Sequence, residues 1–329
     1  MSNTKARNPS IDALKGIAII AVILLHVPTS PAAESVYWQL LDIFGRFAVP
    51  CFFLISGYFF RLSWNRTKEK IEVFRKSAFR IIPIFLFWAL FYATVPPFVG
   101  ELKMPQRLEA ISAYPLSFIL NGNVYHLWFL SSLMQGLVIL GIYLWIGRLY
   151  LGLAVGSILF TISLVISTYF VSSLGSSITF DMKSGPFFST LFVLLGATLA
   201  DGRYRLGNGI AIAATVFGFL ICVAEVSFLH FFYGQPFRGT SLMFGIIPMA
   251  LGLMNLSLNG CIQIPWLASI GRYSLGIYVI HPWFIEILKL PRFGILLDLP
   301  ILIFFLALFL SFLITVLLAK IPYLRKLVL

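Results

Sequence analysis

The sequence predicts an all-α polytopic membrane protein with about ten transmembrane helices and both termini in the cytoplasm. The composition is 60% hydrophobic and only 11% charged, and the mean hydropathy is +0.96. A soluble domain is about half apolar and about a quarter charged, so this chain is of another class. Apolar runs recur along the whole chain, and in a bilayer core such runs are helices, because helices satisfy their own backbone. We expect one transmembrane domain over residues 1–329 and no separate soluble domain.

Ten apolar segments account for the predicted spans. A helix needs about 20 mainly apolar residues to cross the bilayer core, and the sixth and eighth segments are shorter than that. In order, the spans are expected at residues 11–27, 43–62, 79–97, 124–146, 150–171, 187–200, 208–230, 240–256, 266–288 and 295–319.

The basic residues orient these spans. Fifteen Lys and Arg residues fall on the side of the N-terminus and six on the opposite side, and seven of the fifteen lie in a predicted loop from Arg61 to Arg80. The other three, Lys15, Arg46 and Arg272, lie within spans or at their ends. The positive-inside rule therefore puts both termini in the cytoplasm, as an even number of spans requires.

The remaining compositional signals point to no other class. The net charge of +12 would suit a nucleic-acid partner, but the positive-inside rule already explains where the basic residues lie, so no nucleic acid is expected. Residues 1–33 imitate a signal peptide, yet Asp12 and Lys15 interrupt the approach to the apolar run, so we expect no cleavage. The three cysteines have no metal-ligand spacing and are expected to be inert thiols: Cys51, Cys222 and Cys261.

Ionisable residues divide by depth once the spans are oriented. All four histidines are expected on the outer side, at or near span ends: His26, His126, His230 and His281. The cations at or near the inner ends of the spans are Lys15, Arg75, Lys76, Arg80 and Arg272. This division suggests transfer across the membrane, in which a cytosolic anionic donor binds the cations and an outer histidine activates an acceptor hydroxyl. Imidazole suits the second role because it exchanges a proton near neutral pH.

The first span shows the same division within one helix. Lys15 and His26 are eleven residues apart, which returns to nearly the same helix face roughly 16 Å further along the axis. Asp12 is three residues before Lys15 and close enough to pair with it. A polar stripe of this length is expected to face a bundle interior or a wet cavity.

Structural explanations compete with the functional one at each of these positions. Lys15 with Asp12 is alternatively an interfacial pair with the lysine extended to the headgroups. His26 is alternatively a bonding partner for a neighbouring helix. His230 is expected to be interfacial, and the run from Arg61 to Arg80 is alternatively only a topology signal.

Further polar and aromatic residues are equally open to a structural explanation. Trp128 and Trp283 are expected by default to be interfacial aromatics, although each lies near a histidine in the sequence. Asp42 and Arg46 form an i, i+4 pair that suits a structural role. Two intramembrane carboxylates, Glu225 and Glu286, are each able to orient a histidine, and the sequence does not choose between them.

Five stretches in order resemble the acyltransferase-3 family of membrane-bound acyltransferases. They are "IDALKGIAIIAVILLHV", "FFLISGYFF", "RIIPIF", "YHLWFL" and "GRYSLGIYVIHPWF". The resemblance covers essentially the whole chain. Within the family, the short single-domain form is similar to bacterial surface-polysaccharide O-acetyltransferases, including the type that acetylates enterobacterial common antigen. The resemblance implies acetyl-CoA as cytosolic donor, an acceptor sugar hydroxyl on the periplasmic side, and a place in the bacterial inner membrane.

The resemblance also carries residues over. The family's first-helix signature is a basic residue, ten positions and a histidine, which here falls on Lys15 and His26, with lysine in place of the usual arginine. Lysine keeps the charge but loses the planar, bidentate grip on phosphate. Of two arginines expected three apart before the third span, Arg80 matches the second, whereas Ser77 stands at the first. The histidines of the fourth and ninth spans map to His126 and His281.

The expected mechanism follows from these assignments. We expect Lys15, Arg75, Lys76, Arg80 and Arg272 to hold the donor's phosphates, and His26, with Asp12 near the start of its helix, to act as general base or to accept the acetyl group transiently. His126 is expected to orient His26 or stabilise the oxyanion. Residues expected at the substrate are Ser56, Trp128, Tyr278 and His281. No metal is needed, and the expected partners are acetyl-CoA, a glycan or lipid-linked sugar, and membrane lipids.

Two other classes of function remain open. The first is a transporter or flippase of a lipid-linked sugar, which would use the same polar stripe as a pathway. The sequence shows no inverted repeat of the kind many such transporters have. The second is a non-enzymatic subunit of a polysaccharide assembly complex, for which intramembrane His and Lys residues are unexpected.

Overall fold

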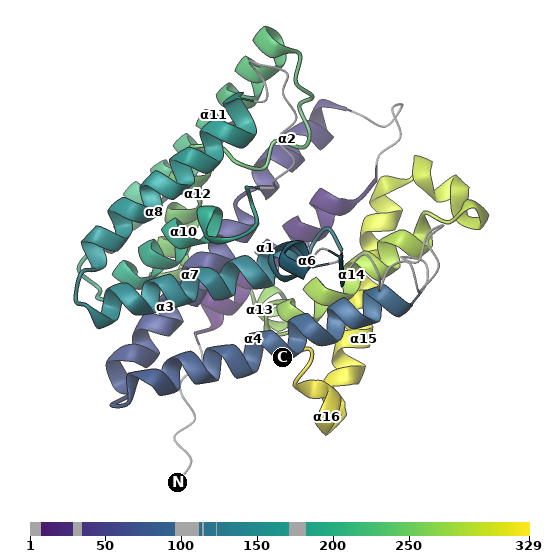
Figure 1. Ribbon diagram of the computed structural model, residues 1–329. Coiled ribbons are helices and arrows are strands. Elements are labelled where there is room, and N and C mark those ends of the chain that lie inside the picture. Colours follow the sequence, from purple (N-terminus) through teal and green to yellow (C-terminus); the bar gives the residue numbers. More distant parts are fainter. Residues whose placement is uncertain (1–7, 29–34, 96–111, 114, 123, 171–181) are drawn as a thin grey trace.

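The computed structural model describes residues 8–28, 35–95, 112–113, 115–122, 124–170 and 182–329, and in these residues it is helical without strands (Figure 1). Seven of the described helical segments are long and apolar enough to cross a membrane, and three shorter apolar helices accompany them. Each of the ten predicted spans overlaps one of these segments. The prediction of an all-α polytopic membrane protein is confirmed.

The helices run in the following order. They are α1 (Pro9–His26), α2 (Val36–Gly45), α3 (Ala48–Arg66), α4 (Lys70–Thr94), α6 (Pro115–Asn121), α7 (Trp128–Trp145), α8 (Leu149–Leu164) with a π-helical extension (Val165–Phe170), α10 (Pro186–Leu199), α11 (Asn208–Tyr233), α12 (Ile246–Leu258), α13 (Pro265–Arg272), α14 (Ser274–Leu288), a 3₁₀ segment (Pro291–Asp298), α15 (Pro300–Lys320) and α16 (Pro322–Arg325).

Helix α1 lies in the middle of the assembly. It packs against α2, α3, α12, α13, α14 and α15. Its first turn is well defined, because the Asn8 side chain accepts hydrogen bonds from the backbone N–H groups of Ser10 and Ile11 and Pro9 occupies the first helical position. The polar stripe of α1 is therefore surrounded by protein along most of its length, as its composition predicts.

Small residues bring several of these helices into backbone contact. Gly57 of α3 lies against the carbonyl of Val193, and Gly196 of α10 lies against the carbonyl of Leu54, so the two helices face each other through paired glycines. Gly271 of α13 lies in the same way against the carbonyl of Asp12 in α1. Membrane helices associate through such close packing because lipid provides little hydrophobic drive between them.

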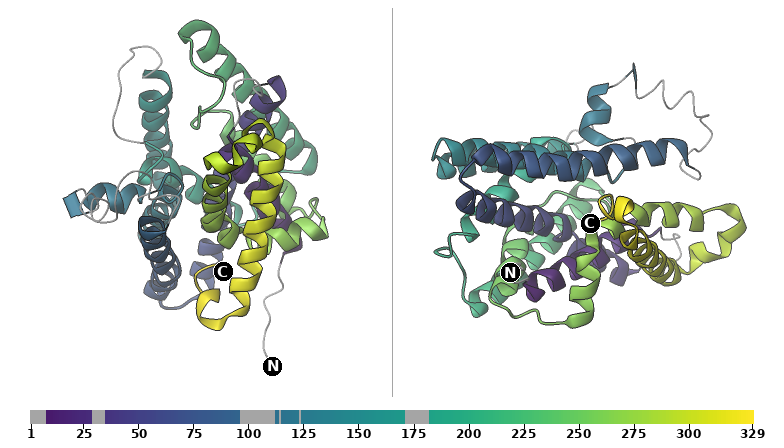
Figure 2. Two further views of the ribbon diagram at one scale, coloured as in Figure 1. Left: turned by 90° about the vertical axis from the view of Figure 1, so that its right-hand side faces the viewer. Right: turned by 90° about the horizontal axis from the view of Figure 1, so that it is seen from below.

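Two predicted boundaries are wrong, and one helix was not predicted. The expected span 266–288 is two helices, α13 and α14, which meet at Arg272 and Tyr273. The predicted loop from Arg61 to Arg80 is mostly helical, because α3 continues to Arg66 and α4 begins at Lys70. The apolar segment before α3 forms a separate helix, α2, which the sequence analysis did not place. Figure 2 shows how α4, lengthened in this way, runs along one side of the assembly.

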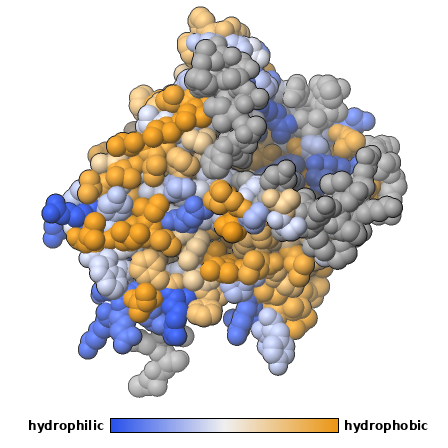
Figure 3. Space-filling view, in the orientation of Figure 1, coloured by the Kyte–Doolittle hydropathy of each residue, from blue (hydrophilic) through white to orange (hydrophobic). Residues whose placement is uncertain are grey.

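The outer surface matches a protein embedded in lipid. Helices α8, α11 and α15 are the most apolar and the least buried within the protein, so their side chains face outward. In Figure 3 hydrophobic residues cover the middle of the face shown, and hydrophilic residues gather toward its edges. A contiguous apolar surface of this size is expected where lipid, not water, is the solvent.

One intramembrane carboxylate has a structural role. The two carboxylate oxygens of Glu225 in α11 accept hydrogen bonds from the backbone N–H groups of Phe244 (2.9 Å) and Gly245 (3.0 Å), directly before α12. The Tyr169 hydroxyl donates a third, at 2.7 Å. Glu225 thus caps the N-terminus of α12, where a negative charge is favourable. The other carboxylate, Glu286, pairs with Lys289 at 2.6 Å, so among the described contacts neither bonds a histidine.

Candidate active site

A cavity of about 730 Å³ opens among α1, α3, α4, α7, α13, α14 and the C-terminal residues. Its volume lies in the range of small-molecule sites, roughly 300–1,000 Å³. Six cationic side chains line it, and none of its described lining residues is Asp or Glu; we call it the cation cavity. The six are Lys15, Arg66, Lys76, Arg80, Arg272 and Arg325.

The cations come from four separate parts of the chain. Lys15 Nζ lies 3.2 Å from Asp12 Oδ1 and 5.5 Å from the centre of the Phe59 ring. Arg272 ends α13 and donates to the Ser269 hydroxyl at 2.8 Å. Because α13 packs closely on the first turns of α1, Lys15 and Arg272 line the same cavity despite their separation in sequence. The cavity is suited to a group that carries several negative charges.

The wall of the cation cavity also includes Val22, Phe129 and Tyr278. The Tyr278 hydroxyl donates a hydrogen bond to the backbone carbonyl of His126. The backbone carbonyl of Val22 accepts a hydrogen bond from His26 Nδ1 at 2.7 Å. Two residues of the cavity wall are therefore bonded directly to histidines on its far side.

Three histidines meet beyond this wall, and we call them the histidine cluster. His26 ends α1, His126 precedes α7 and His281 lies within α14. The His26 and His281 ring centres are 5.2 Å apart, and those of His126 and His281 are 5.9 Å apart. Three tyrosine rings surround the cluster: Tyr92 is 5.1 Å from His126, Tyr125 is 5.2 Å from His26, and Tyr278 is 5.4 Å from His126.

Backbone contacts define the tautomers of two of these histidines. A carbonyl oxygen only accepts, so His26 Nδ1, bonded to Val22, carries the proton. His281 Nδ1 donates in the same way to Tyr278 at 2.8 Å. In a neutral ring each Nε2 then presents a lone pair. His281 Nε2 and both ring nitrogens of His126 are buried without a hydrogen-bond partner among the described residues, and such orphaned polar atoms are characteristic of functional sites.

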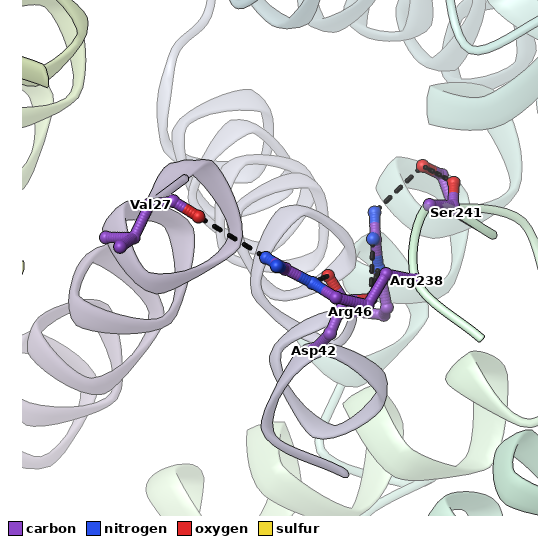
Figure 4. A network of polar contacts seen from close by, with 6 residues as sticks. Val27, Asp42, Arg46, Arg238 and Ser241 are labelled. Carbon is purple, nitrogen blue, oxygen red and sulfur yellow. Dashed lines mark hydrogen bonds and ion pairs between the residues drawn. The ribbon is translucent and has the colours of Figure 1, made fainter. Parts of the chain in front are cut away.

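A second polar group lies at the same end of α1, and we call it the outer ion cluster (Figure 4). Asp42 Oδ2 accepts hydrogen bonds from Arg46 at 2.6 Å and 3.1 Å. Arg46 also donates to the Ser241 hydroxyl at 2.9 Å. Arg238 lies 3.7 Å from Asp42 Oδ1 and donates to the Val27 carbonyl at 3.4 Å. The cluster joins α2 and the segment before α12 to the residue that follows His26.

The structure gathers most of the residues that the sequence singled out. Lys15, Lys76, Arg80, Arg272, Ser56 and Tyr278 line the cation cavity, and His26, His126 and His281 form the histidine cluster. Asp12 is buried beside Lys15. Arg75 does not line the cavity, because its side chain is 65% exposed and pairs with Glu72. Trp128 contacts Phe188 and Lys183 and makes no described ring contact with the cluster.

Four residues of the two sites were missed by the sequence analysis. Arg66 and Arg325 line the cation cavity, and Tyr92 and Tyr125 contact the histidine cluster. Arg66 and Arg325 counted only as loop charges in the topology argument. Tyr125 directly precedes His126 in "YHLWFL", so its position beside a singled-out histidine was the available signal. Tyr92 lies in an apolar run and gives no signal of its own.

The fold and the two sites define a multi-pass membrane protein with a cavity lined by cationic side chains toward one end of α1 and a cluster of histidines at the other. A family model described as an acyltransferase domain matches residues 8–320, nearly the whole chain. The chain belongs to the acyltransferase-3 family of membrane acyltransferases.

Curated relatives share this region within longer proteins. Two proteins of Enterococcus faecalis, each named amino-acid racemase, are 25% identical over 301 residues and 26% identical over 263 residues. These alignments cover 86% and 76% of this chain but 42% and 35% of the relatives. A serine/alanine racemase of Enterococcus gallinarum is 25% identical over 307 residues, which are 84% of this chain and 41% of that protein.

The chain thus spans less than half the length of these relatives. Because the acyltransferase match covers residues 8–320, the part they share with this chain lies largely within the membrane domain. No solved structure matches the chain.

Proposed function

We propose that this acyltransferase is an O-acetyltransferase of the bacterial inner membrane. It takes an acetyl group from cytosolic acetyl-CoA and transfers it to a hydroxyl of a cell-surface polysaccharide or lipid-linked sugar on the periplasmic side. The more specific assignment, acetylation of enterobacterial common antigen, rests on resemblance alone.

The cation cavity suits the donor. Coenzyme A carries a diphosphate and a 3′-phosphate, and a cavity lined by six cationic side chains offsets those charges. The narrow pantetheine arm extends from the nucleotide and is able to follow a cavity whose inner part is apolar, with Val22, Ile84, Phe129 and Leu133 in its wall. The acetyl thioester is then at Tyr278, next to the histidine cluster.

The histidine cluster suits the acceptor step. His26 Nε2 accepts the proton of the acceptor hydroxyl while that oxygen attacks the thioester carbonyl. The C–O bond forms, the C–S bond breaks, and the thiolate of coenzyme A leaves and takes the proton back from His26. His126, whose backbone carbonyl accepts a hydrogen bond from Tyr278, would support the oxyanion of the tetrahedral intermediate.

One observation carries this proposal: the cation cavity ends at residues that are bonded to His26 and His126. Val22 and Tyr278 belong to both the cavity wall and the histidine contacts. A donor bound at the cations would therefore reach residues that contact the base at the opposite end of α1.

The direct test is turnover by the purified protein in detergent. We expect ¹⁴C-acetyl-CoA to yield labelled product with a bacterial cell-surface glycan extract and to release free coenzyme A in equal amount. Absence of both products, together with movement of lipid-linked sugar across proteoliposomes, would establish the transporter in place of the transferase.

A further inference from the structure

The last nine residues return to the helical assembly after α15, and we call Ile321–Leu329 the C-terminal segment. Trp88 Nε1 of α4 donates to the Leu327 carbonyl at 3.0 Å, and Arg80 of α4 donates to the Leu329 carbonyl at 3.0 Å. Val328 is fully buried, against Gly276 of α14. Figure 1 shows the C-terminal end beside α4, far from α4 in sequence. The segment is therefore docked by two hydrogen bonds and a buried side chain.

This docking places Arg325 in the wall of the cation cavity. The neighbouring Lys326 is also exposed but does not line the cavity. Within the described part of the chain, the Arg325 guanidinium makes no hydrogen bond or ion pair with another side chain. It shares the cavity with five other cationic side chains. Like charges that line one cavity repel each other, so this arrangement favours an anionic ligand.

Arg325 follows α15, whose opposite end packs against Val27 beside His26, so Arg325 lies on the side of the cavity away from the histidines. The residues lining that side include Arg66, Thr67 and Lys76, from the end of α3 and the first turns of α4. In a donor whose thioester reaches Tyr278, the part that remains on this side is the phosphorylated nucleotide. A guanidinium there is able to grip phosphate oxygens through two parallel hydrogen bonds.

We propose that the C-terminal segment completes the donor site and that Arg325 binds a phosphate of the coenzyme A nucleotide. This inference rests on the proposed function and adds a binding residue to it. Docking of Leu327 and Leu329 on α4 holds Arg325 at the cavity, and the same contact between Leu329 and Arg80 orients a second cation of the site. The segment is thus part of the donor site, and its basic residues do more than orient the last span.

The test compares two adjacent cations in the full-length protein. Arg325→Ala should raise the dissociation constant for coenzyme A by about 10-fold or more, because a hydrogen bond to a charged group is lost. Lys326→Ala, the matched control, should leave it unchanged. Pantetheine, which lacks the nucleotide, should bind wild type and Arg325→Ala equally. Isothermal titration in detergent measures all three without any acceptor.

Two further variants test how Arg325 contributes to coenzyme A affinity. Arg325→Lys should give an intermediate affinity, because the charge stays and the bidentate grip is lost. Trp88→Phe keeps the ring contacts but removes the donor to Leu327, so it should weaken coenzyme A binding less than Arg325→Ala does. Thermal unfolding of each variant confirms that it is folded.

The outcomes separate this inference from the proposed function. If wild type binds coenzyme A and Arg325→Ala binds it equally well, the role of the C-terminal segment is refuted and the acetyltransferase stands. An equal loss for Arg325→Ala and Lys326→Ala also refutes it, since a general charge effect would then explain the result. If wild type does not bind coenzyme A at all, both proposals fall.

Discussion

His26 has one ring nitrogen committed to the fold and one available for chemistry. Nδ1 donates to Val22, so the ring is fixed at the end of α1 with Nε2 directed away from that bond. His26→Ala should reduce acetyl transfer to less than about 1% of wild type, because a positioned general base contributes about 100-fold or more. The loss should appear in kcat, with coenzyme A binding retained.

A second histidine provides the control for this substitution. His230 bonds the Gln235 carbonyl at 2.8 Å and packs on Phe237, outside the histidine cluster. His230→Ala should therefore keep its activity. More than a few per cent of activity in His26→Ala, or an equal loss in His230→Ala, would contradict the role given to His26.

Lys15 has a structural partner as well as a place in the cavity. Its pair with Asp12 is largely buried, with side-chain exposures of 23% and 6%. Lys15→Ala removes that cation from beside a buried carboxylate, so it should destabilise the protein by about 1–3 kcal/mol. Adding Asp12→Asn should recover most of the stability, because the carboxylate charge is then gone.

The affinity for coenzyme A should not recover in the Lys15→Ala, Asp12→Asn double variant, although its stability does. The cavity still lacks one of its cations, so the dissociation constant for coenzyme A should stay raised. Thermal unfolding and coenzyme A titration separate the two effects. Recovery of both would show that Lys15 serves only Asp12.

At the residue scale, the sequence predicted which groups matter better than it predicted their contacts. His26, His126 and His281 stand out because ionisable groups are rare in spans, and helical spacing links Lys15 to His26. Arg75 could not be separated from Lys76 and Arg80 in this way. Which of these side chains faces the cavity depends on how α4 is rotated against α3 and α7, and that is a matter of tertiary packing.

The contact between α3 and α10 depends on two glycines. A Cβ at Gly57 or Gly196 would overlap a backbone carbonyl of the opposite helix, and backbone cannot move aside as a flexible side chain can. Gly57→Ala or Gly196→Ala should therefore destabilise the protein by about 1–3 kcal/mol, measured as a lower unfolding temperature in detergent. Gly209→Ala in α11, where nothing lies within 4 Å, should cause no such loss. Equal stability of all three variants would show that the glycine contact is dispensable.

At the element scale, hydropathy located the spans but not where helices break or continue. It began the helix of the third span too late in the sequence, at residue 79, since α4 starts at Lys70 and its first turns are charged residues that carry no apolar signal. It also joined α13 and α14, because both are apolar enough to read as one span. Their break at Arg272 coincides with the approach of Gly271 to the backbone of α1, a contact between distant segments that local patterning does not encode.

At the scale of the whole molecule, the cations of the cavity and the histidines are separated along α1. The cations of the cavity lie in the first half of α1, at the end of α3, in the first half of α4, at the junction of α13 with α14, and in α16. His26, the start of α7 and the outer ion cluster lie at the opposite end of α1. The positive-inside rule assigns the cationic end to the cytoplasm. Taken together, these placements predict transfer from one side of the membrane to the other.

The side of the membrane on which each substrate binds is testable in proteoliposomes, because a cysteine of the protein reports its orientation. Of its three cysteines, Cys51 and Cys222 are buried, and Cys261 is exposed between α12 and α13, on the side of the cation cavity. A membrane-impermeant maleimide therefore measures the fraction of molecules whose cationic side faces outward. With acetyl-CoA added outside, only that fraction should be active, and an oligosaccharide acceptor trapped in the lumen should be acetylated. Acetylation confined to acceptor added outside, with none in the lumen, would show that donor and acceptor meet on the same side and would remove the transmembrane step from the mechanism.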